Sequence, residues 1–490
     1  MITRALYAVL ALLYVHRTAV TRYREKPTPR KEPEDRKTMS TATLTRPPRA
    51  YTSAKPQRTP TYEASEDGSL TRLRKRRRAA KKDPPPLVQK VALAAQVYGI
   101  QGVMETMLWF QGWREYFYPP GAGWGPNIVK AYEVRPRMGV RIFFPSSYDL
   151  TSPQTLPTVL SIHGGGFCIG TARDDDQWNR AFADSQGMLV ISLPYSKAPR
   201  APFPGALYDL EALYLAVLGD ESLPIDRTSR RTGRIALLGF DAGANLALGL
   251  SQLPRIKRSA TPPPTAVVSI SGYLDLERPV AHKLSNRPYK PTLPFPRNAR
   301  TDALAATYEA YVWSYVPYGH DLRDPLLSPA FASCGDEGGL PPHVCLVGAE
   351  LDVLGHESWR MACRLVRDIG VSNGDGTRAR WRVPDPDEGD MLERVCGRAV
   401  VSESRGQYEM SELARDDQEI GTKDGVDESK RFGFEERWKD GEGSVKWILV
   451  PDALHGFDRG AMMSASGEEA NKRAYIDQVG RWLRSTVWKM

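Results

Sequence analysis

Two glycine-rich turns, each directly after a short apolar run, carry residues whose types and spacing suit chemistry. The first reads His163-Gly-Gly-Gly-Phe167. Consecutive glycines let backbone N–H groups converge on one point, as an oxyanion hole requires. The second, Gly239-Phe-Asp-Ala-Gly243, has the spacing of a nucleophile elbow, a sharp turn that exposes one side chain. That side chain is Asp241, so the pattern predicts a nucleophile site with an ionised carboxylate in place of a hydroxyl.

An acid and a histidine follow later in the chain, each after another apolar run. Asp352 follows the run His343–Val347, and His455 follows the run that ends at Val450. A carboxylate that orients a histidine, and a histidine that moves protons, are the other two members of a catalytic triad. We therefore expect Asp241, Asp352 and His455 to lie together.

The elements that must position these residues alternate along the chain. Helical apolar spacing covers residues 87–118 and recurs later in the chain. Short β-branched apolar runs lie between the later helices. This alternation predicts an α/β domain with a mainly parallel sheet flanked by helices. Ligands of such sheets bind beyond the carboxyl ends of the strands. The expected strands are Val140–Phe144, Thr158–Ile162, Met188–Leu193, Arg234–Leu238, Thr265–Ser271, His343–Val347 and Val445–Val450, and the later helices are Ala206–Leu218, Asn245–Leu253 and Glu357–Ile369.

These motifs in this order resemble the hormone-sensitive-lipase-like branch of the alpha/beta hydrolases, also called alpha/beta hydrolase fold-3, over residues 87–370 and 444–490. The resemblance implies the alpha/beta-hydrolase fold with N-terminal helical cap elements. It implies an oxyanion hole at Gly165, Gly166 and the backbone of Ala242, with Asp352 as triad acid and His455 as base. It also implies carboxylesterase, lipase or amide hydrolase activity on a small hydrophobic ester-like molecule, with no metal and no organic cofactor.

Two departures from the family pattern affect the expected chemistry. The family carries serine where this chain has Asp241, and it keeps acid and histidine much closer in sequence than the 103 residues between Asp352 and His455. Three readings of the function follow. The domain is an esterase-like hydrolase with an atypical elbow, a catalytically impaired protein that binds a ligand, or a hydrolase of epoxides or alkyl halides with an aspartate nucleophile. In the third reading Tyr308, Tyr311, Tyr315 and Tyr318 activate the epoxide, and otherwise they form an aromatic core face.

The net charge of +9 belongs to the N-terminal end of the chain. Residues 1–90 hold 22 Lys and Arg against 8 Asp and Glu, and we expect 1–86 to be a disordered basic tail. Its apolar segment 5–15 is compatible with membrane or mitochondrial targeting, although an intracellular protein is favoured. The basic run 72–82 is compatible with a nuclear-import signal or with a patch for nucleic acid or anionic lipid, although a solvated basic linker is favoured. No nucleic-acid binding beyond weak contacts of this tail is expected. The five scattered cysteines favour neither a disulfide framework nor a zinc site.

An acidic insertion separates the triad acid from the histidine. Residues 371–443 contain 19 Asp and Glu against 12 Lys and Arg, with glycine and proline throughout. We expect a long, mostly irregular loop with a short helix near Glu388–Arg394, inside an alpha/beta-hydrolase domain that spans 87–490. Such a loop is either disordered or serves as a lid or a docking surface for a protein partner.

Overall fold

The computed structural model of the chain describes residues 82–490 with internal gaps, and all of the described residues belong to one compact unit. The apolar segment 5–15, the basic run up to residue 81 and the expected helix near Glu388–Arg394 lie outside the described residues. The gaps are 119–122, 150, 228–232, 260, 286–302, 335–338, 373–399, 402–407, 410–432, 439–440, 451–452 and 459–467.

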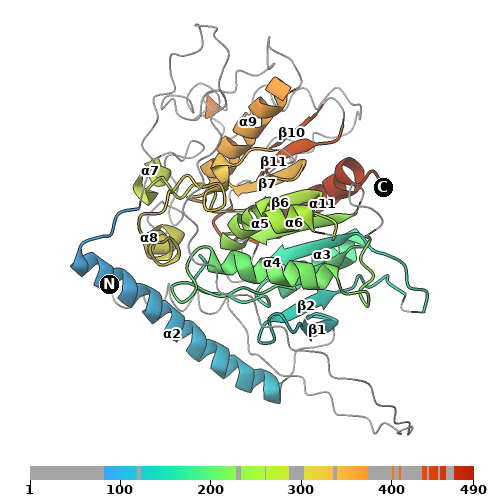
Figure 1. Cartoon of the computed structure of the whole chain (residues 1–490), viewed down its shortest axis with the longest axis horizontal. Helices are drawn as coiled ribbons and strands as arrows, with labels where there is room; N and C mark the ends of the chain where they lie inside the picture. The colour runs from blue at the N-terminus through green and yellow to red at the C-terminus, as the bar shows by residue number, and fades with distance from the viewer. Residues whose placement is uncertain are drawn as a thin grey trace, which may run out of the picture. The chain divides into compact units, whose positions relative to one another are not determined.

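A nine-stranded, mainly parallel sheet forms the centre of the described part (Figure 1). The strand order is β1-β2-β4-β3-β5-β6-β7-β11-β10. The six strands from β4 to β11 in this order run parallel, and β1, β2 and β10 pair antiparallel at the two edges. The bounds are β1 Ile128–Ala131, β2 Gly139–Phe143, β3 Thr158–Ile162, β4 Leu189–Leu193, β5 Ile235–Phe240, β6 Ala266–Ile270, β7 His343–Ala349, β10 Gly433–Arg437 and β11 Ser444–Val450. The seven expected strands are all present within two residues at each end.

Helices cover both faces of this sheet, because successive side chains of its central strands point to opposite faces. In β5, Ile235 and Leu237 pack in one core, and Ala236 and Leu238 pack in the other. The first core includes side chains of α4 (Gly205–Leu218), α5 (Ala242–Gln252) and α9 (Gly355–Ser372), and the second includes side chains of α3 (Asp176–Gln186) and α11 (Glu468–Arg481). The remaining helices are α2 Leu87–Phe117, α6 Pro254–Arg258, α7 Val280–Ser285 and α8 Ala303–Tyr315.

The expected acidic insertion differs from the structure at its carboxyl-terminal end. Gly433–Arg437 forms β10, which pairs antiparallel with β11 from Gly433 opposite Ile448 to Arg437 opposite Ser444. Glu435 there accepts a hydrogen bond from Lys446 at 3.1 Å. The expectation of a mostly irregular loop over residues 371–443 therefore does not hold for this strand. Its high charge concealed it, since an exposed edge strand tolerates charged side chains. A separate small pair of strands, β8 Val400–Val401 and β9 Tyr408–Glu409, also falls in this stretch.

The expected disordered tail also differs at its end. The Lys82 ammonium donates hydrogen bonds to the carbonyl oxygens of Val312 at 3.0 Å, Trp313 at 2.7 Å and Val316 at 2.6 Å. These carbonyls lie at the carboxyl-terminal end of α8 and directly after it, where a basic side chain stabilises the carbonyl oxygens of a helix end. Burial at this position lowers the pKa of Lys82 to about 8. Lys82 therefore belongs to the folded domain.

A single helix, α2, takes the place of the helices expected over residues 87–118 and supplies the N-terminal helical element. It contacts α8, and the Gln96 amide donates to the carbonyl of Ala306 at 3.0 Å. None of the helices that the structure describes is long and apolar enough to cross a membrane.

Candidate active site

Asp241 occupies a sharp turn between β5 and α5. Its backbone lies at φ 54° and ψ −118°, a strained conformation for a residue with a side chain. The turn requires both flanking glycines. A Cβ on Gly239 would lie 2.2 Å from the carbonyl oxygen of Gly243, and a Cβ on Gly243 would lie 2.1 Å from that of Ile162. The elbow spacing in the sequence therefore reflects a real close approach of β3, β5 and α5.

The glycine turn after β3 faces this elbow. Gly165 and Gly166 have φ values of 119° and 56°, a region that side chains disfavour. Their N–H groups donate hydrogen bonds to Asp241 Oδ2, at 2.6 Å from Gly165 and 2.9 Å from Gly166. The two donors that were expected to form an oxyanion hole thus hold the carboxylate of the elbow residue itself. Ala242 directly follows Asp241 as the buried first residue of α5, whose N-terminus also favours negative charge.

His455 bridges the two carboxylates of the expected triad. Its Nε2 lies 3.3 Å from Asp241 Oδ1, and its Nδ1 lies 2.9 Å from Asp352 Oδ2. Burial by itself would lower the pKa of His455, but Asp352 and Asp241, through their charges and hydrogen bonds, outweigh it and raise that pKa well above its usual value. Both carboxylates therefore favour the charged form of the ring, and a charged imidazolium cannot accept a proton as a general base.

Aromatic side chains surround the elbow and the glycine turn. The ring of Tyr311 lies against Gly166, where an added Cβ would be 2.2 Å from the ring carbon Cδ2. Phe167 stacks on Tyr315 with ring centroids 3.8 Å apart, and Tyr308 stacks on Tyr273 at 5.4 Å. Of the four tyrosines considered in the sequence, Tyr308, Tyr311 and Tyr315 are buried, whereas Tyr318 lies beyond α8 and is 42% exposed.

Tyr273 is a site residue that the sequence analysis missed. It follows β6 at the same carboxyl edge of the sheet and is completely buried. Burial, and then the charge of Asp241, raises the pKa of Tyr273 well above its usual value, so the phenol is neutral beside the carboxylate. Its place directly after the strand Thr265–Ser271 was a signal that could have identified it.

A cluster of three side chains that the sequence analysis did not identify, His163, Tyr195 and Lys197, packs at the start of the glycine turn. The imidazole of His163 stacks on Tyr195 at 4.4 Å, and the Lys197 ammonium lies 2.9 Å from His163 Nε2. The Tyr195 hydroxyl donates to the carbonyl of His163 at 3.1 Å. Burial lowers the pKa of Lys197 to about 7. These contacts fix the start of the turn that carries Gly165 and Gly166. Within the described part of the chain, no group of three or more His, Cys, Asp or Glu side chains could hold a metal ion.

The raised pKa of His455 predicts a measurable pH dependence. Asp241→Asn removes one of the two charges that hold the imidazolium, so the pKa of His455, followed by NMR titration, should fall. The folded protein gains stability from this charged pair in full below pH 6.5, the usual pKa of an unfolded histidine, and loses it as pH rises through the raised pKa. The variant should therefore be less stable than the natural protein at neutral pH, and the difference should shrink at high pH. Asp149→Asn, at an exposed carboxylate, is the control, and a His455 that titrates near 6.5 in the natural protein would contradict the pairing.

Comparison with known proteins concerns the central part of the chain. Residues 159–373 match a family described as the alpha/beta hydrolase fold. The chain is 33% identical over 156 residues to hormone-sensitive lipase of Bos taurus, which is 27% of this chain and 19% of that protein. Over this part the chain is similar to the hormone-sensitive-lipase-like alpha/beta hydrolases. It is also similar to an acetyl-hydrolase of Streptomyces hygroscopicus, with 33% identity over 193 residues, or 39% of this chain.

This alpha/beta hydrolase chain covers 56% of the length of the acetyl-hydrolase, so the match concerns a little over half of that protein. Among solved structures, a hyperthermophilic esterase from the archaeon Pyrobaculum calidifontis is similar at 19% identity, with a TM-score of 0.45 over 74% of this chain and 86% of that one.

Proposed function

We propose that this chain is an esterase-type alpha/beta hydrolase domain that binds small hydrophobic ester-like molecules, and that Asp241 blocks serine-type ester hydrolysis in it. One observation carries the proposal. Asp241 Oδ2 accepts the hydrogen bonds of both Gly165 and Gly166, so the donors that would stabilise a substrate oxyanion already hold a negative charge.

The histidine supports the same conclusion. A serine esterase needs a neutral imidazole to take the proton of the nucleophile. Here Asp241 and Asp352 stabilise the charged ring of His455, and Asp241 has no hydroxyl proton to give up. An ionised carboxylate that attacked an ester carbonyl would also form a reactive anhydride. The ligand class is supported by the similarity to an acetyl-hydrolase and by the aromatic surroundings of Phe167 and Tyr311.

The test combines an activity measurement with a binding measurement on the natural protein. We expect no covalent adduct by intact mass after incubation with a fluorophosphonate and no saturable hydrolysis of p-nitrophenyl acetate. We expect the thermal unfolding midpoint to rise with increasing phenyl acetate, because a ligand that binds the folded state stabilises it. Rapid ester turnover would refute the blocked site, and a midpoint that no short aryl or alkyl ester shifts would refute the ligand class.

A second candidate function is hydrolysis of an epoxide with Asp241 as nucleophile, favoured by the anchored Oδ2 and the neutral phenol of Tyr273. Asp241 Oδ1 would attack a saturated epoxide carbon, the carbon–oxygen bond would break, and the released alkoxide would take the Tyr273 proton. The new ester removes the charge of Asp241, which lowers the pKa of His455. The ring would then release its proton to solvent and take a proton from the attacking water, and the hydroxide would add to the ester carbonyl. Gly165 and Gly166 would stabilise the oxyanion on Oδ2 until the diol leaves and the protons return.

Isotope labelling separates the two candidates. A single turnover of styrene oxide in H₂¹⁸O would place one ¹⁸O atom in the Asp241 carboxylate, because water attacks the acyl carbon. The peptide that contains Asp241 would then gain about 2 Da in its mass spectrum, as the two-step covalent mechanism requires. Diol formation without this label, or no diol at all, would exclude the aspartate nucleophile.

A further inference from the structure

The outward face of α2 carries many of the exposed large apolar side chains of the described residues. The helix is 31 residues long, yet its buried residues are Val97, Met104 and Gln111, at a spacing of seven. A spacing of seven places these side chains on one narrow stripe of a helix. Leu93, Ile100 and Met107 pack against the same core as partly buried side chains, and the opposite side of α2 faces outward along one side of the domain (Figure 1).

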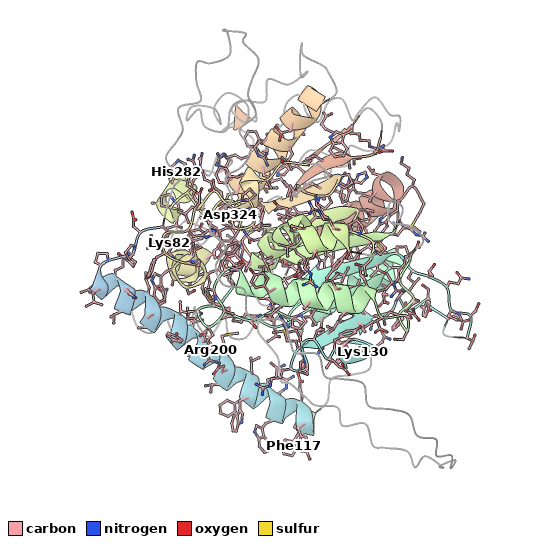
Figure 2. All side chains as sticks on the ribbon, viewed as in Figure 1. Lys82, Phe117, Lys130, Arg200, His282 and Asp324 are labelled. Atoms are coloured by element: carbon pink, nitrogen blue, oxygen red, sulfur yellow. The ribbon has the colours of Figure 1, made fainter. Side chains whose placement is uncertain are left out.

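Aromatic side chains gather on the carboxyl-terminal half of this open face. Trp109 is 59% exposed, Phe110 62%, Trp113 51% and Phe117 62%. These rings contact one another rather than the sheet, with Trp109 and Trp113 centroids 6.0 Å apart and Trp113 stacked on Phe117 at 6.1 Å. Figure 2 shows Phe117 at the end of α2 that lies farthest from α7 and α8. The other large exposed hydrophobic residues of the helix and its continuation are Leu87, Val88, Val91, Tyr98, Val103, Tyr116, Tyr118 and Trp124.

Charge is sparse along α2. Its charged residues are Lys90, Glu105, Arg114 and Glu115, and Glu115 forms an ion pair with Arg173 of the domain body. A surface helix of a soluble domain normally turns a charged face outward, whereas one that is apolar on both sides is covered by something. An exposed apolar patch of this extent marks an interaction site.

We propose that the outward face of α2 docks on an anionic lipid bilayer. Trp, Tyr and Phe are the side chains that favour the membrane–water interface. The chemistry of the neighbouring sequence complements anionic lipid, since residues 72–81 contain seven Lys and Arg in ten positions. A cluster of four to eight basic residues beside an interfacial helix is the pattern that recognises acidic headgroups.

Hydrogen bonds and helix packing connect α2 to the candidate active site. The Gln101 side chain of α2 donates to the carbonyl oxygens of Cys168 and Ala198, both at 2.8 Å. Cys168 follows the glycine turn directly, and α2 also packs against α8, whose Tyr311 lies on Gly166. Docking through α2 would therefore hold the carboxyl edge of the sheet beside the lipid phase, where a hydrophobic ligand dissolves.

The test is co-flotation of the full chain with lipid vesicles. We expect strong binding to phosphatidylcholine vesicles that contain phosphatidylserine, and weaker binding at high salt or to pure phosphatidylcholine. The combined variant Trp109→Gln, Phe110→Gln and Trp113→Gln should bind about 10-fold or more weakly, because three large side chains no longer leave water. Val129→Gln, Val134→Gln and Tyr208→Gln together replace three exposed apolar residues outside α2, and this matched control should bind like the natural protein.

Other occupants of the face give different results. Vesicle binding that the α2 variant retains in full would overturn the proposal. A second result would also overturn the proposal: the natural protein does not bind vesicles but forms a dimer, and the α2 variant dissociates this dimer. A second copy of the chain would then cover the face. A photoactivatable phosphatidylcholine tests the unchanged protein: its crosslinks should map to residues 103–118, and crosslinks confined to other surfaces would contradict the proposal.

Discussion

Replacing Asp241 with serine should raise ester hydrolysis far above that of the natural protein. The substitution frees the N–H groups of Gly165 and Gly166, which now bind Asp241 Oδ2, for the carbonyl oxygen of a substrate. It also removes one of the two negative charges that raise the pKa of His455, so that pKa falls. Asp352, 2.9 Å from His455 Nδ1, keeps the ring oriented toward the new hydroxyl.

The expected gain in rate is large because two obstacles disappear together. A single oxyanion donor is worth about 10²-fold in rate, and two donors become available at once. Hydrolysis of p-nitrophenyl acetate by Asp241→Ser should therefore exceed that of the natural protein by about 10²-fold or more. The same variant should acquire a fluorophosphonate adduct on the peptide that contains residue 241.

Two matched variants isolate the cause of this gain. Asp241→Ala empties the oxyanion hole without supplying a nucleophile, and it should stay inactive. Asp241→Ser combined with His455→Ala supplies the hydroxyl without its base, and it should lose most of the gain. If the natural protein hydrolyses the ester faster than Asp241→Ser does, the carboxylate has a chemical role in ester cleavage, and the blocked-site proposal fails.

The sequence was sufficient to predict the strands and the order of the site residues, because both depend on local patterns. Apolar β-branched runs mark buried parallel strands, and residues that directly follow such strands meet at one edge of the sheet. The distances from His455 to Asp241 and Asp352 follow from that placement. That Asp241 Oδ2 lies on the donors of Gly165 and Gly166 could not be read from spacing, since it depends on a side-chain torsion and on two backbone turns far apart in sequence.

The elements that the sequence analysis missed depend on long-range contacts. Charge marked Gly433–Arg437 as part of a loop, yet hydrogen bonds to β11 place it in the sheet. Lys82 belongs by composition to a basic tail, yet three carbonyl groups at the end of α8, 230 or more residues away, bind its ammonium. The helical periodicity of residues 87–118 was visible, but which side of that helix would be left open depends on where α8 lies. In each case, contacts with a partner distant in sequence determine whether a segment packs into the domain and which side of it is covered. Local propensity does not encode such contacts.

Gly243→Ala should destabilise the whole domain, because the first turn of α5 is pressed against the end of β3. The added methyl group would lie 2.1 Å from the carbonyl oxygen of Ile162 and 2.4 Å from that of His163. Both contacts are with backbone atoms, which cannot rotate away as a flexible side chain can. The elbow must therefore separate from the glycine turn or shift the central strand, and we expect a loss of about 3 kcal/mol in the free energy of unfolding.

Urea unfolding followed by circular dichroism measures this loss, with Gly102→Ala as the matched control. Gly102 lies inside α2 with no atom within 4 Å of its added Cβ, so the same substitution should stabilise the protein by about 0.5–1 kcal/mol through helix propensity. The two alanine substitutions should therefore change the free energy of unfolding in opposite directions, because the space around the added Cβ differs between the two positions. An unchanged midpoint for Gly243→Ala would mean that α5 and β3 can separate at little cost. The hydrogen bonds from Gly165 and Gly166 to Asp241 depend on this same close approach, so the oxyanion hole would then be adjustable rather than fixed.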